Sequence, residues 1–546
     1  DLALSLPGFG PGIALGDEMQ VRLRAFDGSR ALTPTSDPES SFDANERSTS
    51  RYPALAIDAQ DRVWLAFRHL TLKGRTDSYT TPRGRGHWAS YLTSYSGGKW
   101  NRAAQLTRSA GRISSFASLV SAPGGGVWAA WNGDGREWLE LLRPNENHVY
   151  AAYVPGASAA APGLTANTEP PLDAAPAHAR EAQQVERIRG YRATAAGRSY
   201  RIVRGDLHRH AEFSRDQGGG RDGSVLDFYR YMLDAARMDF GAMTEHSNGF
   251  IDYWSWWIEK TTDLFQRQGY AALYGYERTN SYTFGHRNII HPRRGVPLVD
   301  MFTRPESSAG RPTVQGDAPA LLENDTDLLY QELKKSGGIA IAHTTATNQG
   351  TDWKMYNSEV EPAVELYQGL RQNFEALDAP RGVPAGKGGA QFREPGLVSN
   401  AWKKGHRLGV ISSSDHVATH TSYAMVYTEA ATREGILDAI RKRHTYAATD
   451  NIVLDCRVGE HIMGDEFRTA GPPAIRIKVQ GTAPVAKVVV IKDNAVAYTA
   501  QPGTADVELS YRDQAGPNGK SFYYVRIEQS DGQLAWSSPF WISNAK

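Results

Sequence analysis

Histidine and acidic residues recur in short clusters across the middle of this 546-residue chain. His208 and His210 are two residues apart, and residues two apart on a β-strand point to the same face, so both imidazoles can bind one ion. Further clusters follow at the apparent ends of successive strands: Thr244-Glu245-His246, Tyr276-Glu277, Gly285-His286, Ala342-His343 and Ser414-Asp415-His416. This spacing is typical of a metal site and rarely arises from packing alone.

The composition narrows the ligands and the partners. Cys456 is the one cysteine, which excludes an internal disulfide framework and a Cys-type zinc site, so the metal ligands must be His, Asp and Glu. Such ligands suit Zn, Mn or Fe. With 61 Lys and Arg against 60 Asp and Glu, the net charge of +1 gives no reason to expect nucleic-acid or membrane-surface binding. No apolar run approaches the roughly 20 residues of a membrane helix.

The clusters lie in a central region, residues 200–455, where short apolar strands alternate with helical patterns. Ser224 can cap a helix that carries apolar residues at helical spacing. A second helix, from Asp327 to Ser336, ends at Gly337-Gly338, and a buried-type strand follows up to Ala342. This alternation predicts a parallel β/α sheet or barrel, in which ligands bind beyond the carboxyl ends of the strands.

The flanking regions have other patterns. Residues 1–151 contain two copies of a strand, a Gly/Asp turn and a strand with Trp64 or Trp128, which favours a β module with propeller-like blades. Residues 152–199 are rich in Ala and Pro and are expected to form a linker. Residues 456–546 alternate apolar strands with Gly, Pro, Asn and Asp turns, which predicts a small β-sandwich.

The central region resembles the PHP superfamily, named for polymerase and histidinol phosphatase. Four of its motifs occur in order, and three further stretches resemble a subgroup of exported proteins that often carries a C-terminal β domain. The four are Asp206-Leu207-His208-Arg209-His210, Thr244-Glu245-His246, Gly338-Ile339-Ala340-Ile341-Ala342-His343 and Ser414-Asp415-His416; the three are Gly285–Asn288, Val364–Gly369 and Arg443–Asp450. The resemblance implies a distorted (β/α)7 barrel that holds two or three divalent ions, usually Zn, Mn or Fe, and hydrolyses phosphoesters. It also favours a periplasmic or secreted location, with which scarce cysteine agrees.

The resemblance also implies a ligand set. His208, His210 and Glu277 hold a first metal together with an aspartate of the last motif. Glu277 then bridges to a second metal that is held by His286 and His343. A third site uses His246, His416 and Asp216, and the expected catalytic residues are Glu277, Asp415 and His416.

Two points of this assignment depend on local chemistry. Relatives usually have Asp-x-His in the last motif, and we favour Asp415 over Ser414 as the ligand, because an anionic oxygen binds a divalent cation better than a hydroxyl. Arginine binds phosphate oxygens with its planar fork, so Arg287 and Arg371 are the expected substrate-binding residues. Arg209 alternates away from its two histidines on the strand and is expected in the barrel wall or in a salt bridge.

The sequence therefore predicts a metal-dependent phosphoric ester hydrolase that acts on a small molecule. Metal-activated water attacks any polarised electrophile, so hydrolysis of an amide or a carboxyl ester is an alternative. A second alternative is a non-catalytic binding protein with a vestigial site. His291 competes with His286 as a ligand, and we expect His291 to be a core residue, because Gly285 lets the backbone turn sharply at His286.

Overall fold

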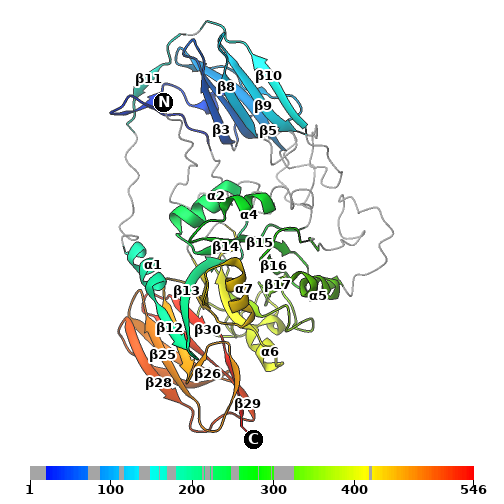
Figure 1. Cartoon of the computed structure of the whole chain (residues 1–546), viewed down its shortest axis with the longest axis vertical. Helices are drawn as coiled ribbons and strands as arrows, with labels where there is room; N and C mark the ends of the chain where they lie inside the picture. Colours follow the sequence, from blue (N-terminus) through cyan, green and yellow to red (C-terminus); the bar gives the residue numbers. More distant parts are fainter. Residues whose placement is uncertain are drawn as a thin grey trace. The chain divides into compact units, whose positions relative to one another are not determined.

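The computed structural model divides the chain into two compact units, one that ends at Asp173 and one that begins at Ala174 (Figure 1). It describes residues 20–48, 50–71, 87–109, 116–133, 148–158, 160–168, 180–211, 214, 222, 225–247, 258–280, 282–296, 298–299, 325–369, 371–416 and 421–545. No helix in these ranges is long and apolar enough to cross a membrane.

The N-terminal unit consists of antiparallel strands. A five-stranded sheet contains β3 (Ser50–Ile57), β4 (Val63–Thr71), β5 (His87–Ser96), β6 (Lys99–Trp100) and β7 (Ala104–Gln105). A three-stranded sheet contains β8 (Ala117–Ser121), β9 (Val127–Gly133) and β10 (His148–Val154), and another contains β1 (Ala25–Phe26), β2 (Ala31–Pro34) and β11 (Leu164–Ala166). A 3-10 helix, η1, spans Pro38–Ser41.

The two sequence repeats of this unit form the hairpins β3–β4 and β8–β9. In the first repeat Asp58 accepts hydrogen bonds from Trp64 Nε1 at 2.7 Å and from Gly126 N at 3.2 Å, so it ties the two repeats together. The buried face between the sheets includes Trp64 and Trp131, whereas Trp128 is half exposed. The two repeats are therefore alike in backbone but not in the burial of their tryptophans.

The expected linker carries regular structure. Within residues 152–199 lie β11, α1 (Glu181–Gly190) and β12 (Arg192–Ala195). Helix α1 buries Val185 and Ile188, and β12 pairs with β13 (Arg198–Asp206) in an antiparallel hairpin. The segment from Glu181 onward thus belongs to the packed second unit, because its apolar residues find a surface to cover.

Seven strands of the central region lie side by side in chain order: β13, β14 (Phe240–Met243), β15 (Ala271–Arg278), β16 (Arg287–His291), β17 (Ile339–Ala342), β18 (Ala363–Gln368) and β19 (Gly409–Ser413). The pairs β13–β14–β15 and β17–β18–β19 are parallel, whereas β16 runs antiparallel to both of its neighbours. The connections contain α2 (Val225–Arg230), η4 (Tyr231–Ala235), α4 (Glu259–Phe265), α5 (Asp325–Ser336), η6 (Glu394–Gly396) and α6 (Val398–Lys403).

The expected (β/α)7 barrel is not evident, because the molecule is largely sheet and its helices are few and short. The central sheet does not close on itself alone but continues from β13 into β20 (Tyr423–Thr428) and β21 (Thr445–Ala448), with α7 (Arg433–Arg441) between them. The ends of β13 and β19 nevertheless meet, since Asp415 N donates to His208 O at 2.8 Å.

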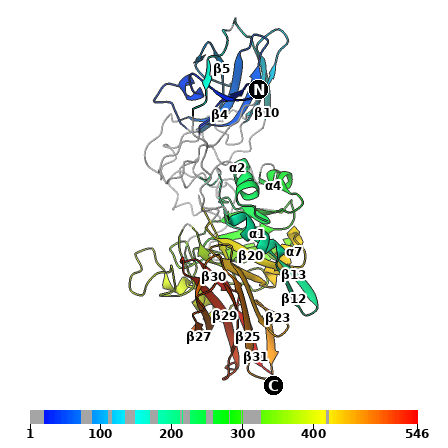
Figure 2. The ribbon, with the colours of Figure 1, turned by 90° about the vertical axis from the view of Figure 1, so that its left-hand side faces the viewer.

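The C-terminal strands, orange and red in Figures 1 and 2, form two sheets, as a β-sandwich requires. One contains β22 (Val453–Val458), β23 (His461–Ile462), β25 (Ala474–Gln480) and β28 (Asp506–Arg512). The other prolongs the central sheet through β30 (Leu534–Ser537), β29 (Lys520–Gln529), β26 (Val485–Lys492) and β27 (Ala495–Ala500). Strand β31 (Phe540–Asn544) pairs with β29, and β24 (Glu466–Thr469) pairs with β31. The C-terminal strands therefore buttress the central ones.

A buried carboxylate joins the two regions. Glu375, which follows β18 and is 1% exposed, accepts hydrogen bonds from Tyr524 OH at 2.7 Å and from Trp536 Nε1 at 2.8 Å. Arg526 Nη1 lies 2.7 Å from the same carboxylate. Loss of this group leaves the buried Tyr524 hydroxyl and Trp536 indole N–H without an acceptor, whereas Arg526 keeps its ion pair with Glu528.

We predict that Glu375→Ala lowers the free energy of unfolding by about 2–6 kcal/mol, because it leaves two buried donors without an acceptor and each costs about 1–3 kcal/mol. Glu508→Ala is the control: its pair with Arg476 is more than half exposed on both sides, and such pairs contribute about 0–1 kcal/mol. Denaturant titration of both variants checks this, and equal losses would contradict the role of Glu375.

Candidate metal centre

The direction of each strand explains which residues meet at one rim of the central sheet. His208 and His210 follow β13, His246 follows β14, Glu277 is the penultimate residue of β15, His343 follows β17, and Asp415 and His416 follow β19. These strands run the same way, so their carboxyl ends share an edge. Because β16 runs the opposite way, its first residues lie at this edge, and His286 precedes them.

The backbone at two of these positions adopts left-handed geometry. Gly285 has φ of 79°, and a Cβ there would lie 2.7 Å from the carbonyl carbon of Gly350, so only glycine fits before His286. Asp415 has φ of 68°, which is uncommon for a residue with a side chain. The turn at Asp415 lets the adjacent side chains of Asp415 and His416 both face the cluster, although neighbours on a strand diverge.

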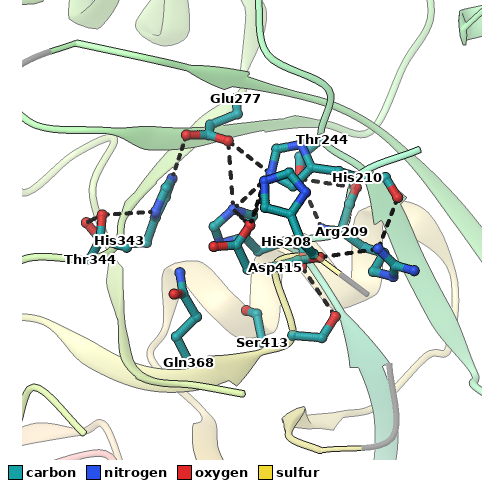
Figure 3. Close-up of polar contacts among 12 residues, drawn as sticks. His208, Arg209, His210, Thr244, Glu277, His343, Thr344, Gln368, Ser413 and Asp415 are labelled. Atoms are coloured by element: carbon teal, nitrogen blue, oxygen red, sulfur yellow. Dashed lines mark hydrogen bonds and ion pairs between the residues drawn. The ribbon is translucent and has the colours of Figure 1, made fainter. Parts of the chain in front are cut away.

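Three groups of buried residues bring their ligand atoms within 4.8 Å of one another. They are His208, Glu277 and His343; His208, His210 and Asp415; and His210, His246 and His416. Figure 3 labels five members of these groups: His208, His210, Glu277, His343 and Asp415. Each group has the residue types and the proximity that a divalent ion requires. The described residues of the predicted ligand set, His286 included, therefore lie around one centre.

In three of the histidines, His208, His210 and His416, the nitrogen that faces away from the cluster contacts an oxygen behind it. His208 Nδ1 lies 2.9 Å from Glu365 Oε2, and His416 Nδ1 lies 2.6 Å from Asp222 Oδ2. His210 Nδ1 lies 2.5 Å from Ser214 Oγ. A partner of this kind fixes the tautomer and turns the Nε2 lone pair toward a metal.

This arrangement limits how the three groups can be filled at once. His208 has one nitrogen left, Nε2, so it can bind one ion although it belongs to two of the groups. We therefore divide the donors into three positions. Position A has His208, His210 and Asp415, position B has Glu277, His343 and His286, and position C has His246 and His416.

Glu277 lies between these positions. Its Oε1 is 2.5 Å from His286 Nδ1 and 3.3 Å from His343 Nε2. Its Oε2 is 3.0 Å from His210 Nε2 and 3.1 Å from His246 Nδ1. The two oxygens thus face different pairs of histidines, which is the arrangement that a bridging carboxylate needs.

Two buried atoms support a cation at this centre. Glu277 Oε2 and His343 Nε2 lie within ion-pair distance of neighbouring groups, but neither makes a hydrogen bond of good geometry in the described part of the chain, and both residues are at most 2% exposed. An unsatisfied buried acceptor costs about 1–3 kcal/mol, so such atoms are rare without a function. A metal ion would satisfy both, and the donor set fits one.

The charges of the centre keep its two carboxylates, Glu277 and Asp415, ionised. Burial raises the pKa of Glu277, but His246, His343 and His286 outweigh burial and hold this pKa well below its usual value. Burial would also raise the pKa of Asp415. Nearby His208, His210 and His416 outweigh burial and hold this pKa well below its usual range. Burial and nearby His208 lower the pKa of His343 well below its usual value, so His343 stays neutral and can donate its lone pair.

Two further acidic residues of the motifs, Asp206 and Glu245, do not belong to the ligand set. They accept hydrogen bonds from backbone and serine groups around it. Asp206 accepts hydrogen bonds from His208 N at 3.0 Å and from Ser414 Oγ, so it ties the end of β13 to the end of β19. Glu245 accepts from Ser214 Oγ at 2.7 Å and from Ala211 N. Burial raises the pKa of Asp206 to about 6 and that of Glu245 to about 7.

The two expected substrate-binding arginines differ. Arg287 is fully buried in an ion pair with Glu361, and its remaining donors contact Tyr330 OH and backbone carbonyls, so the prediction that it binds substrate is corrected. Adjacent side chains on an extended strand point to opposite faces, so the Arg287 side chain points away from the cluster that its neighbour His286 faces. Arg371 is one-third exposed, and its Nε lies 3.8 Å from Asp415 Oδ2.

Other residues fall outside the predicted set. Asp216 lies outside the described residues. Arg209 forms the salt bridge that its strand position predicts, with Nη1 2.8 Å from Asp222 Oδ1. The sequence reasoning missed Asp222, Glu365, Ser214 and Thr279, which contact the outer nitrogens of histidines. Glu365 alone had a signal, since it stands in the Val364–Gly369 stretch.

The comparisons with known proteins are limited. No family model matches the chain. An uncharacterized protein of Chlamydia pneumoniae is 26% identical over 352 residues, or 57% of this chain and 53% of the relative. One of Chlamydia muridarum (strain MoPn / Nigg) is 28% identical over 359 residues, 59% of this chain and 55% of the relative. The chain thus spans about half the length of the curated relatives it matches.

Among solved structures, a similar one is a two-domain protein containing a predicted PHP-like metal-dependent phosphoesterase from Bacteroides vulgatus ATCC 8482. It is 16% identical, with a TM-score of 0.33, and the match covers 64% of this chain and 97% of that one. A similarity this low carries no argument about function, so the function is argued from the chemistry of the site.

We predict that His286→Ala lowers metal affinity by more than about 100-fold, because even the loss of a residue behind a ligand costs 10–100-fold. His291→Ala should leave the metal content unchanged. His291 is 1% exposed at the far end of β16, against Gly338, and has no contact with the cluster among the described residues. Elemental analysis of both purified variants checks this, and the reverse ranking would overturn the assignment.

A pH prediction concerns His291 as well. Burial, with a smaller effect of Arg441, lowers the pKa of His291 to about 4. Stability from a neutral histidine of this kind is fully present above its unfolded pKa of about 6.5 and is lost as the pH falls through about 4. The wild type should therefore lose up to about 3 kcal/mol over this range that His291→Phe does not lose. Denaturant titrations of both chelator-treated proteins at pH 7 and pH 4 measure the difference, and equal losses would contradict it.

Proposed function

We propose that the protein is a metal-dependent phosphoesterase that hydrolyses a small phosphomonoester or phosphodiester at a centre of two or three Zn, Mn or Fe ions. The observation that carries the proposal is the position of Glu277, whose two buried oxygens face separate histidine pairs and include one unsatisfied atom. Bound divalent ions at such a centre supply a water of lowered pKa and balance the charge of phosphate oxygens.

The chain's own residues would do the remaining work. Glu277 and Asp415 stay ionised and would hold divalent cations at the cluster. Arg371 lies beside Asp415 with its side chain one-third exposed, so its planar fork can bind two oxygens of a phosphoryl group that sits on the centre. The histidines are at most 10% exposed by side chain, which keeps bulk water away from the reacting atoms and strengthens these charge interactions.

A PHP-type barrel belongs to this proposal and not to the observed fold. What supports it is the order of the seven strands and the contact between the ends of β13 and β19. The antiparallel β16 and the continuous sheet into the C-terminal region are departures from a regular barrel.

We also propose that the protein acts in the periplasm or outside the cell. The support is the scarcity of cysteine, since Cys456 is the one thiol and is buried. Fractionation of the source cells with an antibody to the protein tests this, and recovery in the cytosol alone would contradict it.

Asp415→Asn tests the function. We expect this variant to lose metal and to lower hydrolysis of p-nitrophenyl phosphate esters at least about 100-fold, because it removes an anion that touches His208, His210 and His416. Ser414→Ala is the matched control, since Ser414 Oγ donates to Asp206 and not to the cluster, and its effect should be mild.

The substrate screen separates this proposal from the two alternatives. Turnover of p-nitrophenyl acetate or p-nitroacetanilide without turnover of the phosphate esters would replace a phosphoesterase by another hydrolase. A protein that is purified without chelator and holds less than one ion per chain would favour a vestigial binding site.

A further inference from the structure

Asn288 is a buried polar residue that the metal centre described so far does not use. It is 0% exposed, and neither its Oδ1 nor its Nδ2 makes a hydrogen bond in the described part of the chain. Ile290 and Ile341 are equally buried and apolar, so a leucine at position 288 would suit its surroundings without an unsatisfied atom. Because an unsatisfied buried donor or acceptor costs stability, we expect this amide to have a partner outside the described protein.

The side chain of Asn288 lies on the face of the sheet that carries the cluster. The Arg287 side chain is buried on the opposite face, and adjacent residues of a strand point to opposite faces. A Cβ at Gly275 would lie 3.0 Å from Ile290 Cδ1, so Gly275 and Ile290 share one face. Glu277 follows Gly275 by two residues and Asn288 precedes Ile290 by two, so both of their side chains lie on this face as well.

The strand register places Asn288 among all three donors of position B. It is paired directly with Glu277 across β15 and β16, where the Cβ atoms of facing residues lie about 4.5–5.5 Å apart. His286 precedes Asn288 by two residues and is held beside His343, whose backbone N donates to His286 O at 3.4 Å. On β17 the residue paired with Asn288 is Ile341, and His343 follows it by two residues. The amide is therefore next to the carboxylate and one step below both histidines.

From this placement we infer that Asn288 Oδ1 is a fourth protein donor at position B, beside Glu277, His286 and His343. Three donors leave at least one coordination position open, since Zn takes four ligands and Mn up to six. A carbonyl-type oxygen is a ligand that suits Mn in particular. The bound ion would give the amide oxygen the partner that the described residues do not supply. The inference rests on the metal binding in the proposed function, but not on the hydrolysis of phosphoesters.

Asn288→Leu tests the inference, because leucine has the same branching and no polar atom. We expect its affinity for one ion per chain to fall about 10–100-fold, the usual cost of losing a group that supports a metal site. Equilibrium dialysis of the full-length protein against buffered Mn²⁺, followed by elemental analysis, measures this affinity. In chelator-treated protein the same variant should melt a few degrees above the wild type, because two unsatisfied atoms are gone. Unchanged metal affinity would overturn the inference.

Asn288→Asp separates an oxygen ligand from a hydrogen-bond donor and remains informative if the leucine variant folds poorly. Aspartate keeps the oxygen and adds a negative charge, so we expect it to bind the ion at least several-fold more tightly than the wild type. If the amide N–H instead held Glu277 in place, aspartate could not donate. Metal affinity would then fall in both variants, and the assignment of Oδ1 as a ligand would be wrong.

Thr326→Val is the matched control. Thr326 Oγ1 is another buried atom without a hydrogen-bond partner among the described residues. It lies on α5, whose Tyr330 contacts Arg287 on the face of the sheet opposite the cluster. This variant also removes an unsatisfied polar atom, but it should leave metal affinity unchanged. A loss equal to that of Asn288→Leu would show that the metal responds to general changes in packing and would overturn the inference.

Combination with His286→Ala assigns the oxygen to its position. If His286 and Asn288 bind the same ion, Asn288→Leu should cause no further loss of metal once His286→Ala has emptied position B. Additive losses would place Asn288 at a different ion and contradict the assignment. A wild-type protein that binds no metal would refute both this inference and the proposed function. Metal binding that depends on Asn288, without phosphoester turnover, would refute the proposed function alone.

Discussion

The buried carboxylate of Glu277 is the group on which the centre depends. It lies within hydrogen-bond or ion-pair range of His210, His246, His286 and His343, and it is 1% exposed. An isolated carboxylate at this depth would be strongly destabilising, and four imidazoles can stabilise it only by taking up protons that their own burial disfavours. Divalent cations remove the conflict, because they satisfy the carboxylate and leave the imidazoles neutral.

The direction of the strands brings the ligands of the centre together. Ligands from β13, β14, β15, β17 and β19 reach one rim because these strands point the same way, and His286 reaches it because it directly precedes β16, which points the other way. The contact of Asp415 N with His208 O and the hydrogen bonds of Asp206 bring the first and last strands together at this rim. Positions 208 and 416 are thereby neighbours although they lie 208 positions apart in the chain.

The sequence predicted the residues of the centre better than the fold that holds it. Side chains two apart on a strand, or next to a glycine at a turn, carry a local signal, as His208, His210 and His286 show. Arg287 was misplaced because its neighbour His286 suggested a site, whereas the alternation of β16 and the buried acid Glu361 decide its position. Asp222 had no local signal, since only the folded chain brings it to His416. The antiparallel β16 was missed for the same reason, because strand direction depends on pairing partners far away in the sequence.

The arginines near the centre show how one set of charges can serve two purposes. Arg209 and Arg371 each pair with an acid beside His416, at 2.8 Å and 3.8 Å. Their charge lowers the local attraction for a cation, but it raises the attraction for an anionic substrate at the same edge of the cluster. The two arginines therefore favour a site where part of the positive potential stays available to the substrate.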